Sequence, residues 1–207
     1  MSDYPLILFA KVPQAGKVKT RLSPELSINE AADVAKALLT ETLQLASNHW
    51  SGKVVLAIWP DTKDVFIQSL IEQFELEVIV QSEGDLGTKM FNAMEQVGYP
   101  CAVMGCDVPH LGEAELYKAH DLLVKHQNII GPTKDGGYYL LGLQSGQPEL
   151  FTKKLWGGDT VLEASLEIAE QKNFQFHQLD MMIDIDHYAD LVKASAVLKS
   201  LQRFLKN

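Results

Sequence analysis

The feature of this chain that most constrains its fold is the repeated alternation of short apolar runs with longer amphipathic segments. The apolar runs predict strands, and the longer segments have helical periodicity. Strands that are apolar on both faces and alternate with helices are typical of a mostly parallel sheet covered on both sides. We therefore predict an α/β fold, a three-layer α/β/α sandwich around a mostly parallel, Rossmann-like sheet. The predicted strands are 5–10, 53–59, 76–81, 101–105, 128–131, 138–143 and 174–179, and the predicted helices are 27–48, 65–74, 86–97, 113–126, 160–172 and 187–205.

Two of the predicted helices begin with the pattern of a capping box. Ser27 is followed by Glu30, and Thr160 is followed by Glu163. In such a box the hydroxyl and the carboxylate each satisfy a free backbone N–H of the first turn. We expect a box at both helix starts.

Length and composition limit the organisation and the partners of the chain. With 207 residues, 46% of them hydrophobic, the chain can bury one sizeable core, and we predict a single domain spanning residues 1–207. A net charge of −9 argues against nucleic acid as a partner. We find no signal peptide and no run long enough to span a bilayer, and Cys101 and Cys106 are typical of buried thiols in a reducing compartment. The cytoplasm is the expected location, and the oligomeric state stays open, a homodimer included.

A basic loop follows the first predicted strand of this acidic chain. It carries Lys11, Lys17, Lys19 and Arg21, with Gly16 as a turn residue, and Asp3 is the one acidic residue before position 25. Loops that follow strands of an open α/β sheet bind ligands, and clustered cations favour an anion such as a nucleotide phosphate. A merely solvated loop is the alternative.

This loop does not have the pattern of the common phosphate-binding motifs. Lys11 stands where a P-loop needs glycine, Val18 stands where it needs Ser or Thr for magnesium, and no GxGxxG follows the first strand. An ATPase or a dinucleotide-binding enzyme is therefore disfavoured. The cations remain suited to phosphate, since arginine can bind phosphate oxygens bidentately and lysines can act as point charges.

Two acidic segments, one with Asp107 and one with Asp184 and Asp186, offer candidate metal ligands. Asp107 follows an apolar strand and is expected at the same crevice as the basic loop, where Mg²⁺ takes one or two carboxylates plus substrate phosphate oxygens. A turn or N-cap aspartate is the alternative. Asp184 and Asp186 alternate and would share a face of an extended segment. Taken by itself, Asp186 is better explained as the N-cap of the last helix.

Two glycine-rich positions are further candidates. Gly136 and Gly137 permit a ligand to approach the backbone, although a plain hairpin turn explains them equally well. Asp159, after Gly157 and Gly158, could be presented to an acceptor by a mobile flap near Trp156, or could lie at the start of a helix.

Five motifs in order along the chain resemble a known family. Thr20 to Pro24 resembles the end of the signature loop of sugar-nucleotide nucleotidyltransferases, and 15–22 is similar to the loop of phospholactate guanylyltransferases. The whole set resembles the bacterial glycosyltransferase-A-like family, some members of which are assigned to arsenosugar biosynthesis, within the nucleotide-diphospho-sugar transferase superfamily. The motifs are Phe9–Leu22, Gly105–Leu111, Asp135–Leu143, Trp156–Val161 and Asp184–Leu191.

The resemblance implies a glycosyltransferase-A fold that binds a nucleotide or nucleotide-sugar through Mg²⁺ or Mn²⁺. It implies that Asp107 and Asp186 hold the metal, although the chain has no full Asp-x-Asp after the central strand. The expected ligand-binding residues are Lys11, Gly16, Lys17, Lys19, Arg21, Gly136 and Gly137, and the expected catalytic residues are Asp107, Arg21, Lys19 and Asp159.

Three functions follow as hypotheses. The first is a metal-dependent glycosyltransferase that uses a nucleoside-diphosphate sugar and an unknown small acceptor. The second is a nucleotidyltransferase that joins a nucleoside triphosphate to a phosphorylated metabolite and releases pyrophosphate. The third is a nucleotide-binding protein without turnover.

Overall fold

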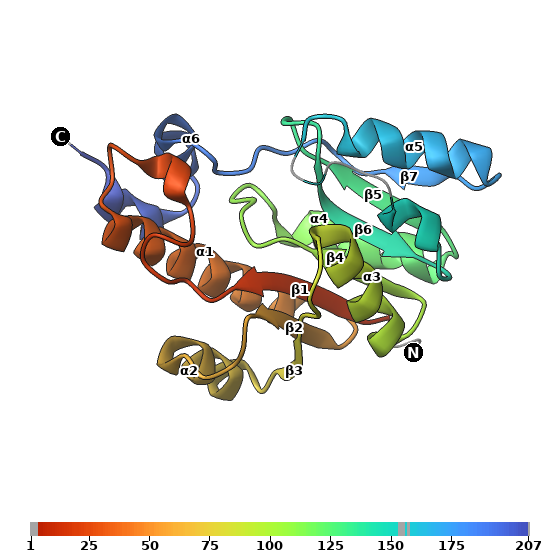
Figure 1. The fold of residues 1–207 in the computed structure, drawn as a ribbon, viewed down its shortest axis with the longest axis horizontal. Helices are drawn as coiled ribbons and strands as arrows, with labels where there is room; N and C mark the ends of the chain where they lie inside the picture. The colour runs from red at the N-terminus through yellow and green to blue at the C-terminus, as the bar shows by residue number, and fades with distance from the viewer. Residues whose placement is uncertain (1–3, 153–155, 157, 207) are drawn as a thin grey trace.

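A computed structural model describes residues 4–152, 156 and 158–206 and shows a seven-stranded sheet with helices on both faces. The strand order is β3-β2-β1-β4-β6-β5-β7 (Figure 1). The strands are β1 (Leu6–Lys11), β2 (Val54–Trp59), β3 (Glu77–Val80), β4 (Cys101–Met104), β5 (Asn128–Pro132), β6 (Tyr138–Leu143) and β7 (Phe176–Gln178). The predicted α/β sandwich with a mostly parallel sheet is confirmed.

Strand β6 is the exception to the parallel arrangement. It pairs antiparallel with β4 and with β5, whereas the other four pairings of the sheet are parallel. The chain first adds β2 and β3 on one side of β1 and then adds β4 on the other, with Leu8 beside Met104. The strand order therefore reverses between β1 and β4, and ligands of open α/β sheets bind at such a reversal, beyond the carboxyl ends of the strands.

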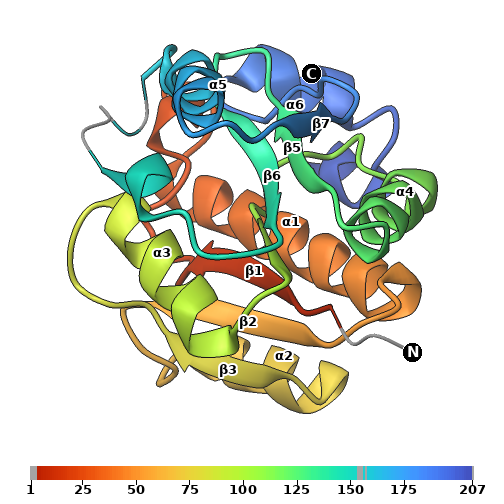
Figure 2. The ribbon, with the colours of Figure 1, turned by 90° about the vertical axis from the view of Figure 1, so that its right-hand side faces the viewer.

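Alternation along the strands divides the sheet's apolar side chains between two cores. In β1, Leu6 and Leu8 belong to one core and Ile7 belongs to the other. The first core packs under α1 (Ile28–His49), α2 (Val65–Phe74) and α4 (Glu113–Val124). The second packs under α3 (Leu86–Val97), the 3₁₀ turn η2 (Pro148–Phe151) and α5 (Val161–Gln171). Figure 2 shows β1 between α1 and α3, as a three-layer sandwich requires.

A third, smaller core joins the segment after the basic loop to the C-terminal part of the chain. It contains Leu22 and Leu26, which follow the basic loop, the first half of α1, and the segments α6 (Tyr188–Ala194) and η3 (Lys199–Phe204). In Figure 1 the loop after β1 and the segment around α6 lie side by side at one end of the molecule. This core fixes the basic loop beside the segment that carries Asp186.

The predicted final helix 187–205 is wrong in part, because the structure breaks it into α6 and the 3₁₀ helix η3. Leu198 is extended (φ −100°, ψ 102°), and the hydroxyl of Ser195 donates to the Val192 carbonyl at 2.6 Å. The break turns Leu201 and Phe204 into the third core, where both are buried. Burial of these side chains therefore outweighs helix continuation.

One of the two predicted capping boxes forms and the other does not. Ser27 accepts from the Glu30 N–H at 3.3 Å, and Glu30 accepts from the Ser27 N–H at 2.8 Å. Thr160 has no such bond, since its backbone is not extended (φ −111°, ψ 5°). The N–H of Leu162 instead donates to the Gly136 carbonyl at 2.9 Å. A tertiary contact thus satisfies a neighbouring donor of the first turn, while the Thr160 side chain does not cap the Glu163 N–H that the predicted box would have bonded.

None of the described helices combines the length and apolar character needed to cross a bilayer.

Candidate functional site

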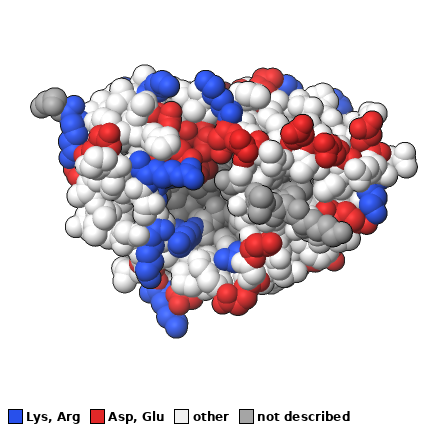
Figure 3. All heavy atoms as spheres, turned by 45° about the horizontal axis from the view of Figure 1, so that its top comes forward, with Lys and Arg blue, Asp and Glu red and all other residues white. Residues whose placement is uncertain are grey.

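A cleft lies at the carboxyl ends of β1 and β4 and has two lobes. The basic lobe has a volume of about 330 Å³ and is lined by the four cations of the basic loop together with Asp107 and Asp186. The acidic lobe has a volume of about 410 Å³. Both volumes are in the range of small-molecule sites. The two lobes share Phe9, Arg21, Cys106, Asp107 and Asp186. Figure 3 looks into this hollow, with Lys and Arg beside it and Asp and Glu above it.

Lys19 is bonded across the cleft rather than free in solvent. Its Nζ lies 3.0 Å from Asp107 Oδ2 and donates to the Ile185 carbonyl at 2.6 Å, and its side chain is 13% exposed. Its backbone is left-handed (φ 47°), a conformation that is uncommon for a residue other than glycine. The two bonds from Nζ offset this local strain and tie the basic loop to the opposite wall.

The other cations of the loop remain more accessible. Arg21 pairs with Asp186, but its side chain is 62% exposed. Lys11 Nζ donates to the Lys17 carbonyl at 3.1 Å, which fixes the shape of the loop. Gly16 has a positive φ of 75°, which suits the expected turn, and it lines neither lobe.

The opposite wall is the segment that leads into α6. Met182 donates to the Pro132 carbonyl at 3.0 Å and accepts from the Lys134 N–H at 3.0 Å, and it forms a β-bridge with Thr133. Ile185 then donates to the Asp107 carbonyl at 3.0 Å. Backbone bonds therefore hold this segment beside the ends of β5 and β4, which brings its aspartates to the cleft.

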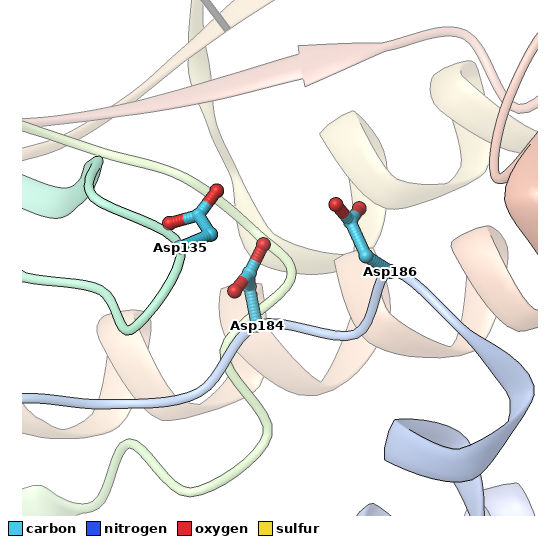
Figure 4. Close-up of side chains that lie close together, drawn as sticks. All are labelled: Asp135, Asp184 and Asp186. Atoms are coloured by element: carbon cyan, nitrogen blue, oxygen red, sulfur yellow. The ribbon is translucent and has the colours of Figure 1, made fainter. Parts of the chain in front are cut away.

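Three carboxylates form a cluster in the acidic lobe. One oxygen from each of Asp135, Asp184 and Asp186 lies within 4.8 Å of the others. Figure 4 shows that Asp135 comes from the loop between β5 and β6, and that Asp184 and Asp186 project from the same side of the segment before α6. Asp135 Oδ1 is held by the Thr133 hydroxyl at 2.6 Å and the Gly137 N–H at 3.1 Å.

Burial and the neighbouring carboxylates raise the pKa of Asp184 to about 6. Desolvation is the largest cause, followed by the charge of Asp135 and, more weakly, those of Asp107 and Asp186. Like charges gathered in a partly buried place favour either a proton or a cation between them. The donor set, all carboxylate oxygen, fits Mg²⁺ or Mn²⁺.

The structure arranges the acidic residues differently from the sequence prediction. Asp107 is paired with Lys19 and lies outside the cluster, whereas Asp186 belongs to it. The N-cap of α6 is His187, with Asp190 accepting from its N–H at 3.0 Å, so the interpretation of Asp186 as a cap is wrong. Asp135 was not predicted as a site residue. Its place before Gly136 and Gly137, in a motif that the sequence does reveal, was the available signal.

Gly136, Gly137 and Asp159 lie at different positions relative to the cleft. A Cβ at Gly136 would lie 1.9 Å from the Asp159 carbonyl oxygen, so Gly136 is packed against that backbone. Gly137 lines the acidic lobe. The Asp159 side chain is exposed and is not part of either lobe. Gly157 of the predicted flap lies outside the described residues.

Both cysteines are free thiols, Cys101 buried and Cys106 half-buried. Burial, with a smaller effect from Glu95, raises the pKa of Cys101 to about 12. Burial and the Asp107 charge also raise the pKa of Cys106, whose Sγ contacts the Phe9 carbonyl at 3.5 Å. Cys106 therefore lines the cleft as a neutral, weakly polar group.

The fold is that of the nucleotide-diphospho-sugar transferases. A protein of Desulfovibrio desulfuricans G20, provisionally assigned as a nucleotide-diphospho-sugar transferase, aligns over 100% of both chains with 24% identity and a TM-score of 0.82. The 4-diphosphocytidyl-2C-methyl-D-erythritol synthase of Anaerococcus prevotii aligns over 95% of this chain and 96% of its own, with 12% identity and a TM-score of 0.61. A Mycobacterium tuberculosis protein solved in complex with manganese aligns over 94% and 98%, with 15% identity and a TM-score of 0.53.

The chain belongs to the family described as "Uncharacterized protein conserved in bacteria (DUF2064)", whose profile matches residues 42–158, more than half of the chain. That match includes Asp107 and Asp135 but neither the basic loop nor Asp184 and Asp186. No curated protein matches the sequence.

Proposed function

We propose that this protein is a metal-dependent glycosyltransferase that takes a nucleoside-diphosphate sugar and transfers the sugar to a small acceptor. The observation that supports this most is that four cations and two carboxylates from distant segments open onto one lobe of the cleft. A diphosphate bound with a divalent ion carries both charge signs, and such a ligand matches both kinds of side chain. The transferase fold of the neighbouring structures agrees with this proposal.

In this proposal the basic loop holds the diphosphate. Arg21 is exposed and can exchange Asp186 for two phosphate oxygens, since its fork geometry suits a bidentate contact. Lys11, Lys17 and Lys19 add point charges around the same lobe. These cations stabilise the negative charge that develops on the leaving diphosphate as the glycosidic C–O bond breaks, which is often the largest catalytic contribution.

The carboxylates of the cleft are the proposed metal ligands. Asp107 and Asp186 were expected from the sequence, and Asp135 and Asp184 join Asp186 in the cluster. Bound Mg²⁺ or Mn²⁺ would supply charge neutralisation for the leaving diphosphate. Asp135 is already oriented by Thr133 and Gly137, so little rearrangement is needed to present its carboxylate.

The ion pairs across the cleft imply coupled binding of metal and nucleotide. Phosphate alone would leave Asp107 and Asp186 without their cations, and metal alone would leave Lys19 and Arg21 without their carboxylates. A metal–nucleotide complex replaces both partners at once. We therefore expect each ligand to increase the affinity for the other.

A thermal-shift panel tests the proposal. Nucleoside triphosphates, nucleoside-diphosphate sugars and Mn²⁺ are added singly and in combination. A ligand at a hundred times its dissociation constant adds about 2.7 kcal/mol to stability, a readily measured rise in Tm. We expect at least one nucleoside-diphosphate sugar to raise Tm with Mn²⁺ by more than the sum of the separate effects. Equal shifts with and without Mn²⁺ would count against the proposal.

Nucleotidyl transfer is the second candidate, favoured by the lysines of the loop and by the fold shared with the 4-diphosphocytidyl-2C-methyl-D-erythritol synthase. The released product distinguishes the two reactions. A glycosyltransferase releases a nucleoside diphosphate from a nucleotide-sugar, whereas a nucleotidyltransferase releases pyrophosphate from a triphosphate. Binding without either product would favour a nucleotide-binding protein without turnover.

A further inference from the structure

Asp135 is held by different partners from those of Asp107 and Asp186. The last two are paired with cations of the basic loop, which a bound metal would displace. Asp135 Oδ1 instead accepts from an uncharged hydroxyl and an uncharged amide, and no described residue donates a hydrogen bond to its Oδ2. Figure 4 shows this carboxylate beside that of Asp184. The bonds to Oδ1 can therefore persist when a metal binds, and they decide which oxygen of Asp135 the metal can reach.

Two donors occupy Asp135 Oδ1. The Thr133 hydroxyl donates to it at 2.6 Å and the Gly137 N–H donates to it at 3.1 Å. An ionised carboxylate has roughly four lone-pair sites, divided equally between its two oxygens. The two donors therefore use the capacity of Oδ1, and Asp135 can offer a metal only one oxygen, Oδ2.

The Thr133 side chain is part of the wall of the acidic lobe. It is 6% exposed, so water competes little for its hydroxyl. Its backbone N–H donates to the Gly137 carbonyl at 3.0 Å, and the residue forms the β-bridge with Met182, on the segment that leads to Asp184. Thr133 thus joins the two segments that supply the cluster and fixes its hydroxyl against Asp135.

Divalent cations differ in how many carboxylate oxygens they need. Ca²⁺ takes roughly six to eight oxygen ligands and often uses both oxygens of one carboxylate, whereas the smaller Mg²⁺ keeps an octahedral shell of few carboxylates, waters and phosphate oxygens. Mn²⁺ suits the same octahedral oxygen sites. A carboxylate that offers one oxygen therefore costs Ca²⁺ a ligand and costs Mg²⁺ or Mn²⁺ none.

We propose that Thr133 is a positioning residue that keeps Asp135 a one-oxygen ligand and thereby selects Mg²⁺ or Mn²⁺ over Ca²⁺. This inference rests on the metal of the proposed function and deepens it, because it names the side chain that sets the choice of ion. Thr133 acts through Asp135 and is not itself a ligand.

Competition between Mn²⁺ and Ca²⁺ tests this inference without nucleotide. The electron paramagnetic resonance signal of free Mn²⁺ is followed as protein and then Ca²⁺ are added, which gives both affinities. Thr133→Val keeps the β-branched shape and removes the hydroxyl. Because partners that orient metal ligands contribute roughly 10- to 100-fold to metal affinity, we expect Mn²⁺ binding to weaken about tenfold. Ca²⁺ binding should not weaken, so the ratio of the two affinities should fall by about the same factor.

Three further variants show whether the hydroxyl acts through Asp135. Thr133→Ser retains a hydroxyl and should keep the preference for Mn²⁺. Thr40→Val is the matched control, since the Thr40 hydroxyl donates to the Lys36 carbonyl at 2.9 Å within α1, outside both lobes, and its loss should change neither affinity. In an Asp135→Asn background, Thr133→Val should have no further effect on the ratio, because the two groups act as one unit.

Four results would overturn the inference: an unmodified protein that does not bind Mn²⁺ more tightly than Ca²⁺, an unchanged ratio in Thr133→Val, loss of the preference in Thr133→Ser, and an equal fall in the Asp135→Asn background. Circular dichroism checks the fold of each variant, and Thr133→Ala takes the place of Thr133→Val if the latter is unfolded. No nucleotide enters this readout. A failed thermal-shift panel would therefore contradict the proposed function without altering the ion preference, and an unchanged ratio would contradict the role of Thr133 without altering the panel.

Discussion

The two sides of the cleft are built in different ways. The basic side comes from one loop, 11–21, between β1 and η1 (Thr20–Leu22). The acidic side comes from three segments: the end of β4, the loop between β5 and β6, and the stretch before α6. Charges that are contiguous along the chain can be recognised from the order of residues alone. How charges from separate segments pair or cluster cannot be recognised in this way, because it depends on the strand order and not on their spacing along the chain.

The two sides also depend on each other. Lys19 is held by Asp107, and Arg21 by Asp186, so each wall of the cleft supplies the counterions of the other. The surrounding third core keeps the basic loop and the Asp186 segment together. A substitution on one wall should therefore also alter the charged side chains of the other wall. The following substitutions separate the contributions of the two walls to ligand binding and stability.

The largest effect is expected for Asp107→Ala at the junction of the lobes. We expect loss of Mn²⁺-dependent nucleotide stabilisation and a fall in transfer rate of about a hundredfold, or ~3 kcal/mol of barrier. The variant removes a proposed ligand and the partner of Lys19. Shifts in Tm measure the stabilisation by nucleotide, and kcat/KM measures the transfer rate. Asp121→Ala, on the surface of α4, is the control, and an unchanged Mn²⁺-dependent affinity in Asp107→Ala would refute the assignment.

Substitutions of Arg21 should have the next largest effect and test the geometry of the basic wall. A hydrogen bond to a charged group contributes about 1.5–3 kcal/mol, so Arg21→Lys should weaken nucleotide-sugar binding by about tenfold and Arg21→Ala by about a hundredfold. Titration calorimetry measures the affinities. Arg203→Lys, the only other arginine position, lies over Phe204 in the third core and should leave binding unchanged. Equal affinities for Arg21→Lys and the unmodified protein would argue against a bidentate contact.

Asp184→Asn should separate stability from metal binding on the acidic wall. Because the pKa of Asp184 is raised to about 6 in the folded state, its neutral form is favoured, and the metal-free protein loses stability as pH rises from about 4 to 6. With chelator at pH 8 the variant should be more stable by about 1–2 kcal/mol, after allowance for solvent screening. Mn²⁺ should stabilise it less than the unmodified protein. Melting curves from pH 4 to 8 measure both effects, and a destabilised variant at pH 8 would contradict the pKa argument.

The smallest effects are expected at the helix starts beside the two walls, where substitutions change only the free energy of unfolding. Ser27→Ala removes the cap of α1, next to the basic loop, and should cost about 1 kcal/mol of unfolding free energy. Thr160→Ala, at the start of α5 behind Asp135, should cost close to nothing, because its side chain caps no N–H. Urea unfolding measures the free energy of unfolding of both variants. A similar loss for both would show that Thr160 caps its helix in solution.

Local patterns predicted most elements but not the conformation at the two places where distant segments decide it. The observed bounds of α2, α3 and β6 are the bounds predicted from the sequence. Boundary residues explain this agreement, because an Asp N-cap, a Gly or a Pro lies next to each element. The break at Leu198 and the unused cap at Thr160 had no local signal. In both places a distant partner, the first half of α1 or the Gly136 carbonyl, decides the local conformation.

The sequence by itself determined the layered α/β fold and the basic loop, since strand period, helix period and contiguous charge are all local properties of the chain. Only the tertiary structure decided that Asp135, Asp184 and Asp186 cluster, that Asp107 pairs with Lys19, and that Gly136 supports a helix start. The physical reason is the strand order. It brings the ends of β1, β4 and β5 and the segment before α6 to one cleft, where charges from distant parts of the chain interact.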